Sequence, residues 1–223
     1  MNLATSPSHR FSEIHAALYA KLRNNSVNLQ AVNSGMSVLS LEPEQALVFA
    51  YVRIHSEAQL VEKMIGLRST EIDLQRHPLI ELRLTERHLA LELVLSPHAW
   101  WDQRNLIGKL SVRRHHDELR ELLLALPQEM ILGHWHGAAL SDQHLTLRHL
   151  RSPRVMDAWL QTFSDGRDPI RIGIWQEASA INGPDAVADL FEAAQSLYGV
   201  YRFLAWTGRN DFQAFYNQRQ ESL

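Results

Sequence analysis

The chain has 223 residues, of which 45% are hydrophobic and 21% are charged, with a formal net charge of −3. These values are typical of a globular protein that buries enough surface to fold without crosslinks. Cysteine is absent, which excludes disulfides, thiolate metal sites and cysteine nucleophiles. The small negative charge argues against a general electrostatic grip on nucleic acid, so nucleic acid is not an expected partner.

The N-terminal part of the chain predicts an amphipathic helix. Residues 1–9 are expected to fray, and four apolar residues then recur at helical spacing: Phe11, Ile14, Leu18 and Leu22. The chain does not begin with a basic segment followed by an apolar run, and no apolar stretch approaches ~20 residues. We therefore expect a cytoplasmic protein with no signal peptide and no membrane partner.

The run QALVFAYVRI, residues 45–54, predicts a buried strand, because it is almost continuously apolar and rich in strand-forming residues. Residues 56–67 predict the helix that follows. Leu60, Met64 and Leu67 recur at helical spacing and are expected on its inner face.

Two runs with apolar residues at alternate positions, LIELRL at 79–84 and LALELVL at 89–95, predict a β-hairpin. The four residues TERH separate the runs. If the turn is symmetric, Leu84 lies opposite Leu89 and each earlier residue pairs with the corresponding later one. The apolar residues of both strands then share one face of the sheet.

The same register places Glu81 directly opposite Glu92, and like charges at opposed positions destabilise a sheet. Arg83 lies diagonal to Glu92 and can offset the repulsion on a solvated face. The alternatives are an arginine from elsewhere, a proton shared between the carboxylates, or a ligand cation. If the pair is partly buried, one glutamate has a raised pKa and can act as an acid. Glu81, Arg83 and Glu92 are therefore candidate ligand-binding residues.

The run after the hairpin predicts two helices, one opening at Ser96 and one from Ser111 to Pro127. Trp100 and Trp101 are adjacent near the start of the first helix. Neighbouring helical residues point about 100° apart, so both can hardly be buried in one core. We expect Trp100 in the core, with Trp101 covering a neighbouring helix or lining a groove as a candidate ligand-binding residue.

The runs MILGHWH at 130–136 and HLTLRHL at 144–150 predict two further strands joined by a seven-residue loop. If they pair symmetrically, the polar face sets three residue pairs opposite each other: His136 and His144, His134 and Thr146, and Leu132 and Arg148.

Three imidazoles on adjacent strands can reach the distances that zinc or a similar divalent transition metal requires. His134, His136 and His144 are therefore candidate metal ligands, and the metal is the one cofactor that the sequence suggests. The alternatives are metal-free binding of a polar ligand, with Arg148 as a ligand-binding residue, and a solvated strand face.

The C-terminal part predicts a helix over 152–163, a strand over 170–175 and a long helix from Pro184 to about residue 204. The helix at 152–163 resembles the one at 56–67 at an offset of 96 residues, which suggests an internal duplication of 45–127 and 144–206. No Gly-, Ser- or Pro-rich linker divides the chain. We therefore predict one domain over residues 1–223. Its fold is α+β, with a mixed, mainly antiparallel sheet, packed helices and two pseudo-symmetric strand–helix–strand halves.

Several segments together resemble the small bacterial YktB-like family in element order and apolar pattern, over roughly residues 10–206. They are HPLIELRLTERHLALELVLSP, DELRELLLALPQEM, PIRIGIW and YGVYRFLAW. The resemblance implies an α+β fold of two halves and a similar length. The family is itself uncharacterised, so the resemblance implies no activity and carries over no catalytic residue.

The chain has neither a glycine-rich phosphate-binding loop nor the Gly-x-Ser-x-Gly turn of serine hydrolases. The function that we expect is therefore the binding of a small molecule or a protein partner in a groove on the sheet. The alternatives are a metal-dependent enzyme that uses the three histidines, and a protein–protein interaction scaffold. The sequence leaves open the oligomeric state and whether the protein is an enzyme.

Overall fold

The protein has an α+β fold, seen here in a computed structural model that describes residues 7–39, 46–67, 71–133, 135–136, 139–140 and 144–212. Its sheet has the strand order β1-β2-β3-β4-β9-β5-β8, and every strand pair in it is antiparallel. A separate pair is formed by β6 and β7. The strands are β1 (Leu29–Asn33), β2 (Leu47–Arg53), β3 (Leu79–Leu84), β4 (His88–Leu95), β5 (Ile131–Leu132), β6 (Trp135–His136), β7 (Ala139–Leu140), β8 (Leu145–Thr146) and β9 (Ile170–Glu177).

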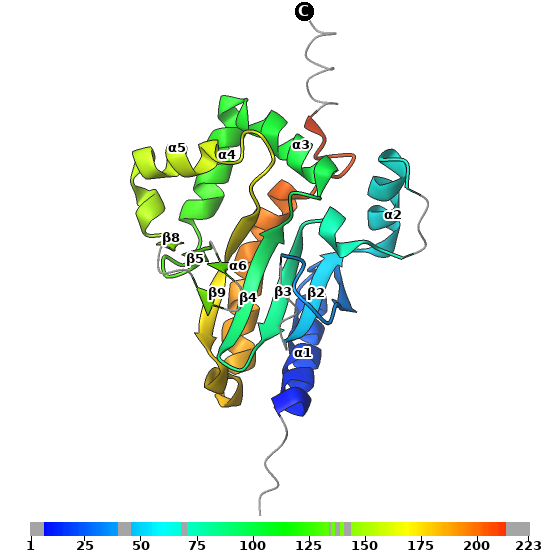
Figure 1. Ribbon diagram of the computed structural model, residues 1–223, viewed down its shortest axis with the longest axis vertical. Coiled ribbons are helices and arrows are strands. Elements are labelled where there is room, and N and C mark those ends of the chain that lie inside the picture. The colour runs from blue at the N-terminus through cyan, green and yellow to red at the C-terminus, as the bar shows by residue number, and fades with distance from the viewer. Residues whose placement is uncertain are drawn as a thin grey trace, which may run out of the picture.

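The helices form two groups around this sheet (Figure 1). Two of them, α1 and α6, lie behind the sheet and pack against each other and against its strands. The helices α3, α4 and α5 lie beyond one end of the strands, and α2 lies at the side. The helices are α1 (Pro7–Asn24), α2 (His55–Met64), α3 (Trp100–Leu110), α4 (Arg113–Leu124), α5 (Pro153–Gln161) and α6 (Ala186–Leu204). Three 3₁₀ turns complete the described elements: η1 (Leu74–Arg76), η2 (His149–Arg151) and η3 (Ala178–Asn182).

Helix α1 confirms the prediction made from apolar spacing. Its buried residues are Phe11, Ile14, Leu18 and Leu22. These positions recur every three or four residues, so they form one stripe on the helix. The stripe belongs to the main hydrophobic core, which lies between the sheet and the helices α1 and α6 and also includes buried residues of α3, α4 and α5.

The hairpin of β3 and β4 also confirms its predicted register, because Leu84 pairs with Leu89 and Glu81 pairs with Glu92. Alternation along the strands turns the leucine-rich face toward the main core. The opposite face carries the charged residues together with a smaller apolar cluster that includes Val52. The segment before residue 40 covers this second face, since Val38 packs against that cluster.

The predicted pairing of the histidine-containing strands is wrong. Strand β5 pairs with β8 so that Ile131 lies opposite Thr146, whereas the symmetric register set His134 there. His136 pairs with Ala139 in the separate β6–β7 hairpin and not with His144. Residues 135–136 and 139–140 pair with each other as β6 and β7. The two predicted strands are therefore not joined by one symmetric loop. The predicted strand 144–150 shortens to β8 and is followed by η2.

Helix α2 has a different inner face from the one predicted. Its buried residues are Ala58, Val61 and Glu62, whereas Leu60 is 50% exposed and Met64 is 40% exposed. The predicted inner face is wrong because Glu62, a charged residue, takes a buried position that the apolar spacing assigned to leucine and methionine. The helix predicted from Ser96 begins only at Trp100 as α3.

The two strand–helix–strand units differ in topology. Strands β2 and β3, which flank α2, are adjacent and antiparallel, whereas β5 lies between the strands β8 and β9 that flank α5. The internal duplication and the single domain over residues 1–223 stay predictions.

Candidate functional site

The predicted carboxylate pair lies in a buried charge cluster on the sheet. Glu81, Arg83 and Glu92 are each no more than 2% exposed, so the interpretation of a solvated face is wrong. The Glu92 Oε2 atom accepts hydrogen bonds from Arg83 Nη2 at 3.1 Å and from Arg171 Nη2 at 3.3 Å. An arginine from elsewhere, one of the predicted alternatives, therefore joins Arg83 in offsetting the opposed carboxylates.

Glu81 is held by the segment that covers this face of the sheet. Its carboxylate accepts hydrogen bonds from Ser37 Oγ at 2.7 Å and from the Val38 N–H at 2.8 Å. Burial raises the pKa of Glu81, although these two hydrogen bonds and Arg171 act to lower it. Because the cluster is buried beneath residues 37–38, its geometry suits anchoring that segment better than contact with a ligand from solution.

Glycine at position 173 makes room for this cluster. A Cβ atom there would lie 2.2 Å from the Leu91 carbonyl oxygen and 2.9 Å from Glu92 Cγ. Both distances are shorter than real contacts, so any larger residue would push strand β9 away from β4 or displace the Glu92 carboxylate from its arginines.

The remaining sequence-predicted site residues do not form one group. His134 and the side chain of His136 lie outside the described residues, His144 is half-buried, and Arg148 is exposed at the start of η2. Among the residues described, no group of three histidine, aspartate or glutamate side chains gathers as a metal site would. The metal prediction remains a prediction because two of its three ligands fall outside that part of the chain.

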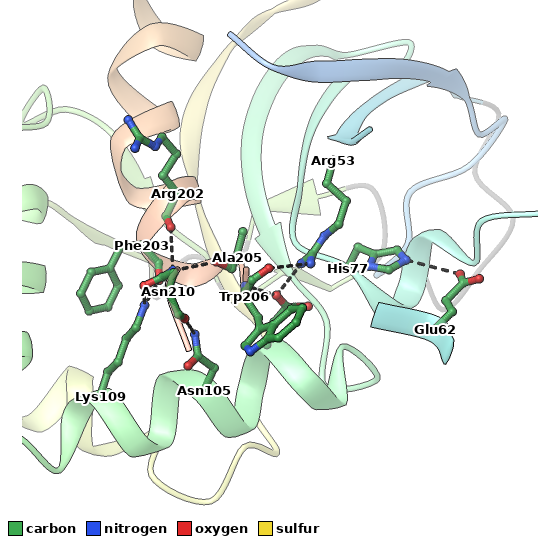
Figure 2. A network of polar contacts seen from close by, with 11 residues as sticks. Arg53, Glu62, His77, Asn105, Lys109, Arg202, Phe203, Ala205, Trp206 and Asn210 are labelled. Atoms are coloured by element: carbon green, nitrogen blue, oxygen red, sulfur yellow. Dashed lines mark hydrogen bonds and ion pairs between the residues drawn. The ribbon is translucent and has the colours of Figure 1, made fainter. Parts of the chain in front are cut away.

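A polar stripe on helix α3 organises the other end of the molecule (Figure 2). Asp102, Asn105 and Lys109 are at most 5% exposed, and their spacing of three and four residues places them on one helix face. All three bind the backbone or a side chain of residues 203–212, which include the end of α6 and the segment after it. The stripe therefore fixes that segment against α3.

The first member of the stripe forms a buried ion pair that holds Trp206. Asp102 accepts hydrogen bonds from the Arg53 guanidinium and from the Trp206 N–H, the latter at 2.6 Å. Arg53 Nη1 also donates to the Trp206 carbonyl at 2.9 Å. Burial acts to lower the pKa of Arg53, but the charge and hydrogen bond of Asp102, together with Tyr201 and Glu57, raise it overall. Strand β2, helix α3 and the segment after α6 therefore meet at one charged contact.

The other two members fix the turn that follows. Lys109 Nζ donates to the Phe203 carbonyl at 2.6 Å and to the Asn210 side chain, and lies 4.3 Å from the centre of the Phe203 ring. Asn105 donates to the Asn210 carbonyl at 2.9 Å and accepts from the Phe212 N–H at 2.8 Å. Burial lowers the pKa of Lys109 to about 8. The backbone after α6 is thus fixed on both sides of residue 206.

A buried histidine extends the network toward α2 (Figure 2). His77 is fully buried, and its Nε2 atom lies 3.4 Å from Glu62 Oε1, which also accepts from the Asp73 N–H at 3.0 Å. Burial, Arg53 and Arg76 lower the pKa of His77 to about 3. The imidazole is therefore uncharged near neutral pH, and its contact with Glu62 is a hydrogen bond.

A cavity of about 870 Å³, here called the polar cavity, opens beside this network. Its wall includes Arg53, Tyr201 and Trp206, and its charged residues are Glu57, Glu118, Arg202 and Arg209. Within the described part of the chain, the Arg53 Nε–H and the Tyr201 hydroxyl are buried without a hydrogen-bond partner. Burial raises the pKa of Tyr201, so its hydroxyl keeps its proton and can donate it. Two hydrogen-bond donors are therefore buried in the wall of one cavity.

A second cavity of about 530 Å³, here called the aromatic cavity, lies against α3 and shares Trp206 with the polar cavity. Trp100 and Trp101 contribute to its wall, together with Arg104 and Phe212. Trp100 is 51% exposed, so its predicted place in the core is wrong. Trp101 lines the cavity and stays a predicted ligand-binding residue.

Both cavities depend on residues that the sequence analysis did not select. The available signal was the sequence DQRNLIGK, in which an aspartate, an asparagine and a lysine recur at helical spacing. Such a stripe usually indicates a solvated helix face, and only its burial against residues 203–212 distinguishes it from one. Arg53 and Tyr201 gave no signal, because each lies within an apolar run.

Comparison with protein-family models and with curated protein sequences finds no match to this chain. The resemblance to the YktB-like family therefore stays a prediction. Among the described helices, none combines the length and the apolar character needed to cross a membrane.

Proposed function

We propose that the protein binds a small molecule with a hydrogen-bond acceptor group in the polar cavity. The observation that carries this proposal is the pair of buried donors in its wall, Arg53 Nε–H and Tyr201 O–H. A buried donor without an acceptor costs about 1–3 kcal/mol. A ligand whose carboxylate or carbonyl oxygen reaches these donors would recover that cost on binding.

The cavity has the size and the rigidity that a binding site requires. Pockets for small molecules typically measure about 300–1,000 Å³, and this one measures about 870 Å³. Asp102 and the Trp206 carbonyl hold both terminal nitrogens of Arg53, so its guanidinium has a fixed orientation. A ligand would not have to order this side chain, which removes one of the usual entropic costs of binding.

The charges around the cavity favour a ligand with little net charge. Asp102 already neutralises Arg53. The remaining charged residues of the wall are two arginines and two glutamates, namely Arg202, Arg209, Glu57 and Glu118. A polyanion would meet as many carboxylates as free guanidinium groups here. A monocarboxylate or an amide fits this balance better, because it carries one acceptor group and at most one charge.

This proposal keeps the predicted class of function and changes its location. The sequence analysis expected a groove on the sheet around Glu81, Arg83 and Glu92, and these side chains are buried. The metal-dependent enzyme and the interaction scaffold stay predictions.

The test is a titration of the ¹⁵N-labelled full-length protein with acetate, acetamide and inorganic phosphate, followed by NMR. We expect acetate and acetamide to shift the amide signals of residues 198–210 saturably, and phosphate to bind more weakly than acetate. The Tyr201→Phe variant should bind acetate about 10-fold or more weakly, because a hydrogen bond to a charged group is worth about 1.5–3 kcal/mol.

Tyr51→Phe is the matched control. Tyr51 is also buried, but its hydroxyl pairs with His15 Nδ1 at 2.9 Å and does not line the polar cavity. This variant should bind acetate as the wild type does. The proposal fails if no probe shifts these signals saturably, or if both tyrosine variants bind equally well.

A further inference from the structure

We infer that the aromatic cavity is a second binding site, which takes an uncharged flat aromatic ring carrying a hydrogen-bond acceptor. This inference concerns a site separate from the proposed polar cavity and does not depend on it. It is carried by the arrangement of three tryptophans and by one buried indole N–H group. The chemical class of ligand is a heteroaromatic compound of one or two rings.

Three indole rings in or beside the cavity offer different surfaces to a flat ligand. The rings of Trp100 and Trp101 lie 5.3 Å apart at 43°, and those of Trp101 and Trp206 lie 6.0 Å apart at 84°. Aromatic rings prefer offset-stacked and edge-to-face contacts with centres 4.5–7 Å apart. A planar ring that stacks on one of these indoles can therefore meet another with its edge. A volume of about 530 Å³ is ample for a two-ring compound.

Trp206 is the reason that the ligand needs a hydrogen-bond acceptor. This residue is 6% exposed, and its Nε1–H group has no hydrogen-bond partner within the described ranges. Figure 2 shows the indole pointing toward α3, the helix that contributes most of the aromatic wall. An indole nitrogen can only donate. The ligand that completes this wall therefore has an acceptor, such as a ring nitrogen or a carbonyl oxygen.

The charged residues of the aromatic cavity, Arg104 and Asp211, carry opposite charges, so its wall favours an uncharged ligand over a charged one. Arg104 already lies over the Trp100 ring, with its guanidinium carbon 5.6 Å from the ring centre. A cationic ligand stacked on the same indole would be repelled by this guanidinium and would gain no cation–π attraction that is not already present. An uncharged ring meets no such repulsion.

The cavity wall is fixed before a ligand arrives. The backbone of Trp206 is bound on both sides by Asp102 and Arg53, and Asn105 holds Phe212 in place. The half-exposed Trp100 stands at the first position of α3, where a ligand from solution can reach it. Rigid walls with an exposed aromatic entry favour binding, because little ordering accompanies it.

The test compares quinoline with naphthalene, two molecules of nearly equal shape of which only quinoline has an acceptor nitrogen. Binding to the full-length protein is measured by quenching of tryptophan fluorescence and confirmed by ligand-observed NMR. We expect quinoline to bind about 3- to 10-fold more tightly than naphthalene, as one hydrogen bond predicts. Trp206→Phe should abolish this preference, so that the variant binds quinoline and naphthalene with equal affinity, and a preference that survives in this variant would contradict the inference.

Trp100→Ala provides a second variant that does not disturb the core, because this side chain is half exposed. It should weaken both compounds by a similar factor. Leu124→Ala, at an exposed leucine on α4 that lines neither cavity, should change neither affinity. The inference is overturned if neither compound binds saturably, if both bind equally to the wild type, or if Trp100→Ala leaves both affinities unchanged.

Discussion

Replacing Tyr201 by phenylalanine should stabilise the ligand-free protein. The substitution removes one hydroxyl group and leaves the ring that packs in the core. Tyr201 is 4% exposed, and within the described residues its hydroxyl has no hydrogen-bond partner. Folding therefore removes this hydroxyl from water without replacing the hydrogen bonds that water supplied.

The expected gain follows from this environment. An unsatisfied buried polar group costs about 1–3 kcal/mol, so Tyr201→Phe should raise the free energy of unfolding by about 1 kcal/mol or more. For a protein of this size, that gain corresponds to a rise of roughly 2–4 °C in Tm. Tyr51 is equally buried, but its hydroxyl lies 2.9 Å from His15 Nδ1. Tyr51→Phe should therefore lower the free energy of unfolding by about 1 kcal/mol.

Urea unfolding monitored by circular dichroism measures both variants under identical conditions. The two variants should change the free energy of unfolding in opposite directions, although both lose one hydroxyl group from a buried tyrosine. A loss of stability in Tyr201→Phe as large as that in Tyr51→Phe would refute the reasoning. It would show that the Tyr201 hydroxyl is satisfied in solution and is not available to a ligand.

Three further predictions concern the buried charges. Asp102→Leu should lower the free energy of unfolding by about 3–5 kcal/mol, because Arg53 stays buried without its carboxylate. Adding Arg53→Met should recover most of this loss in urea titrations, and an equal loss in the double variant would contradict the prediction. Burial raises the pKa of Glu81 above its ordinary value of 4.5, so its contribution to stability is present below that pH and is lost as the pH rises through the raised pKa. Glu81→Gln should therefore gain stability relative to the wild type as the pH rises above 4.5, and a constant difference would count against the burial argument. Burial lowers the pKa of Lys109 from 10.5 to about 8, so the stability of the wild type relative to Lys109→Met should rise between these two values, and a flat profile would indicate an ordinary lysine.

The histidine-containing segment shows where inference from the sequence failed. Its strands were expected to pair around one symmetric loop, but β5 and β8 pair in one register and β6 and β7 form their own hairpin. A shift of one residue in register moves every side chain to the other face of a strand. The joint metal site of His134, His136 and His144 depended on that register, so its geometric basis is lost, and metal binding by these residues stays a prediction.

Local sequence patterns were sufficient to predict an element whose apolar residues all face the hydrophobic core. The four apolar residues of α1 and the alternation in β3 and β4 gave the correct helix, hairpin and register, including the opposed pair Glu81 and Glu92. Such patterns depend on the periods of a helix and a strand, and these periods are properties of the backbone itself.

Only the tertiary structure decided which polar residues are buried and what they bind. Asp102 pairs with Arg53, 49 residues away, and holds the backbone of Trp206, 104 residues away. No local pattern encodes such distant contacts, because burial of a charge is favourable only when its partner arrives from another element. For the same reason the sequence predicted an α+β fold, while the two cavities that meet at Trp206 became visible only when strand β2, helix α3 and the segment after α6 came together.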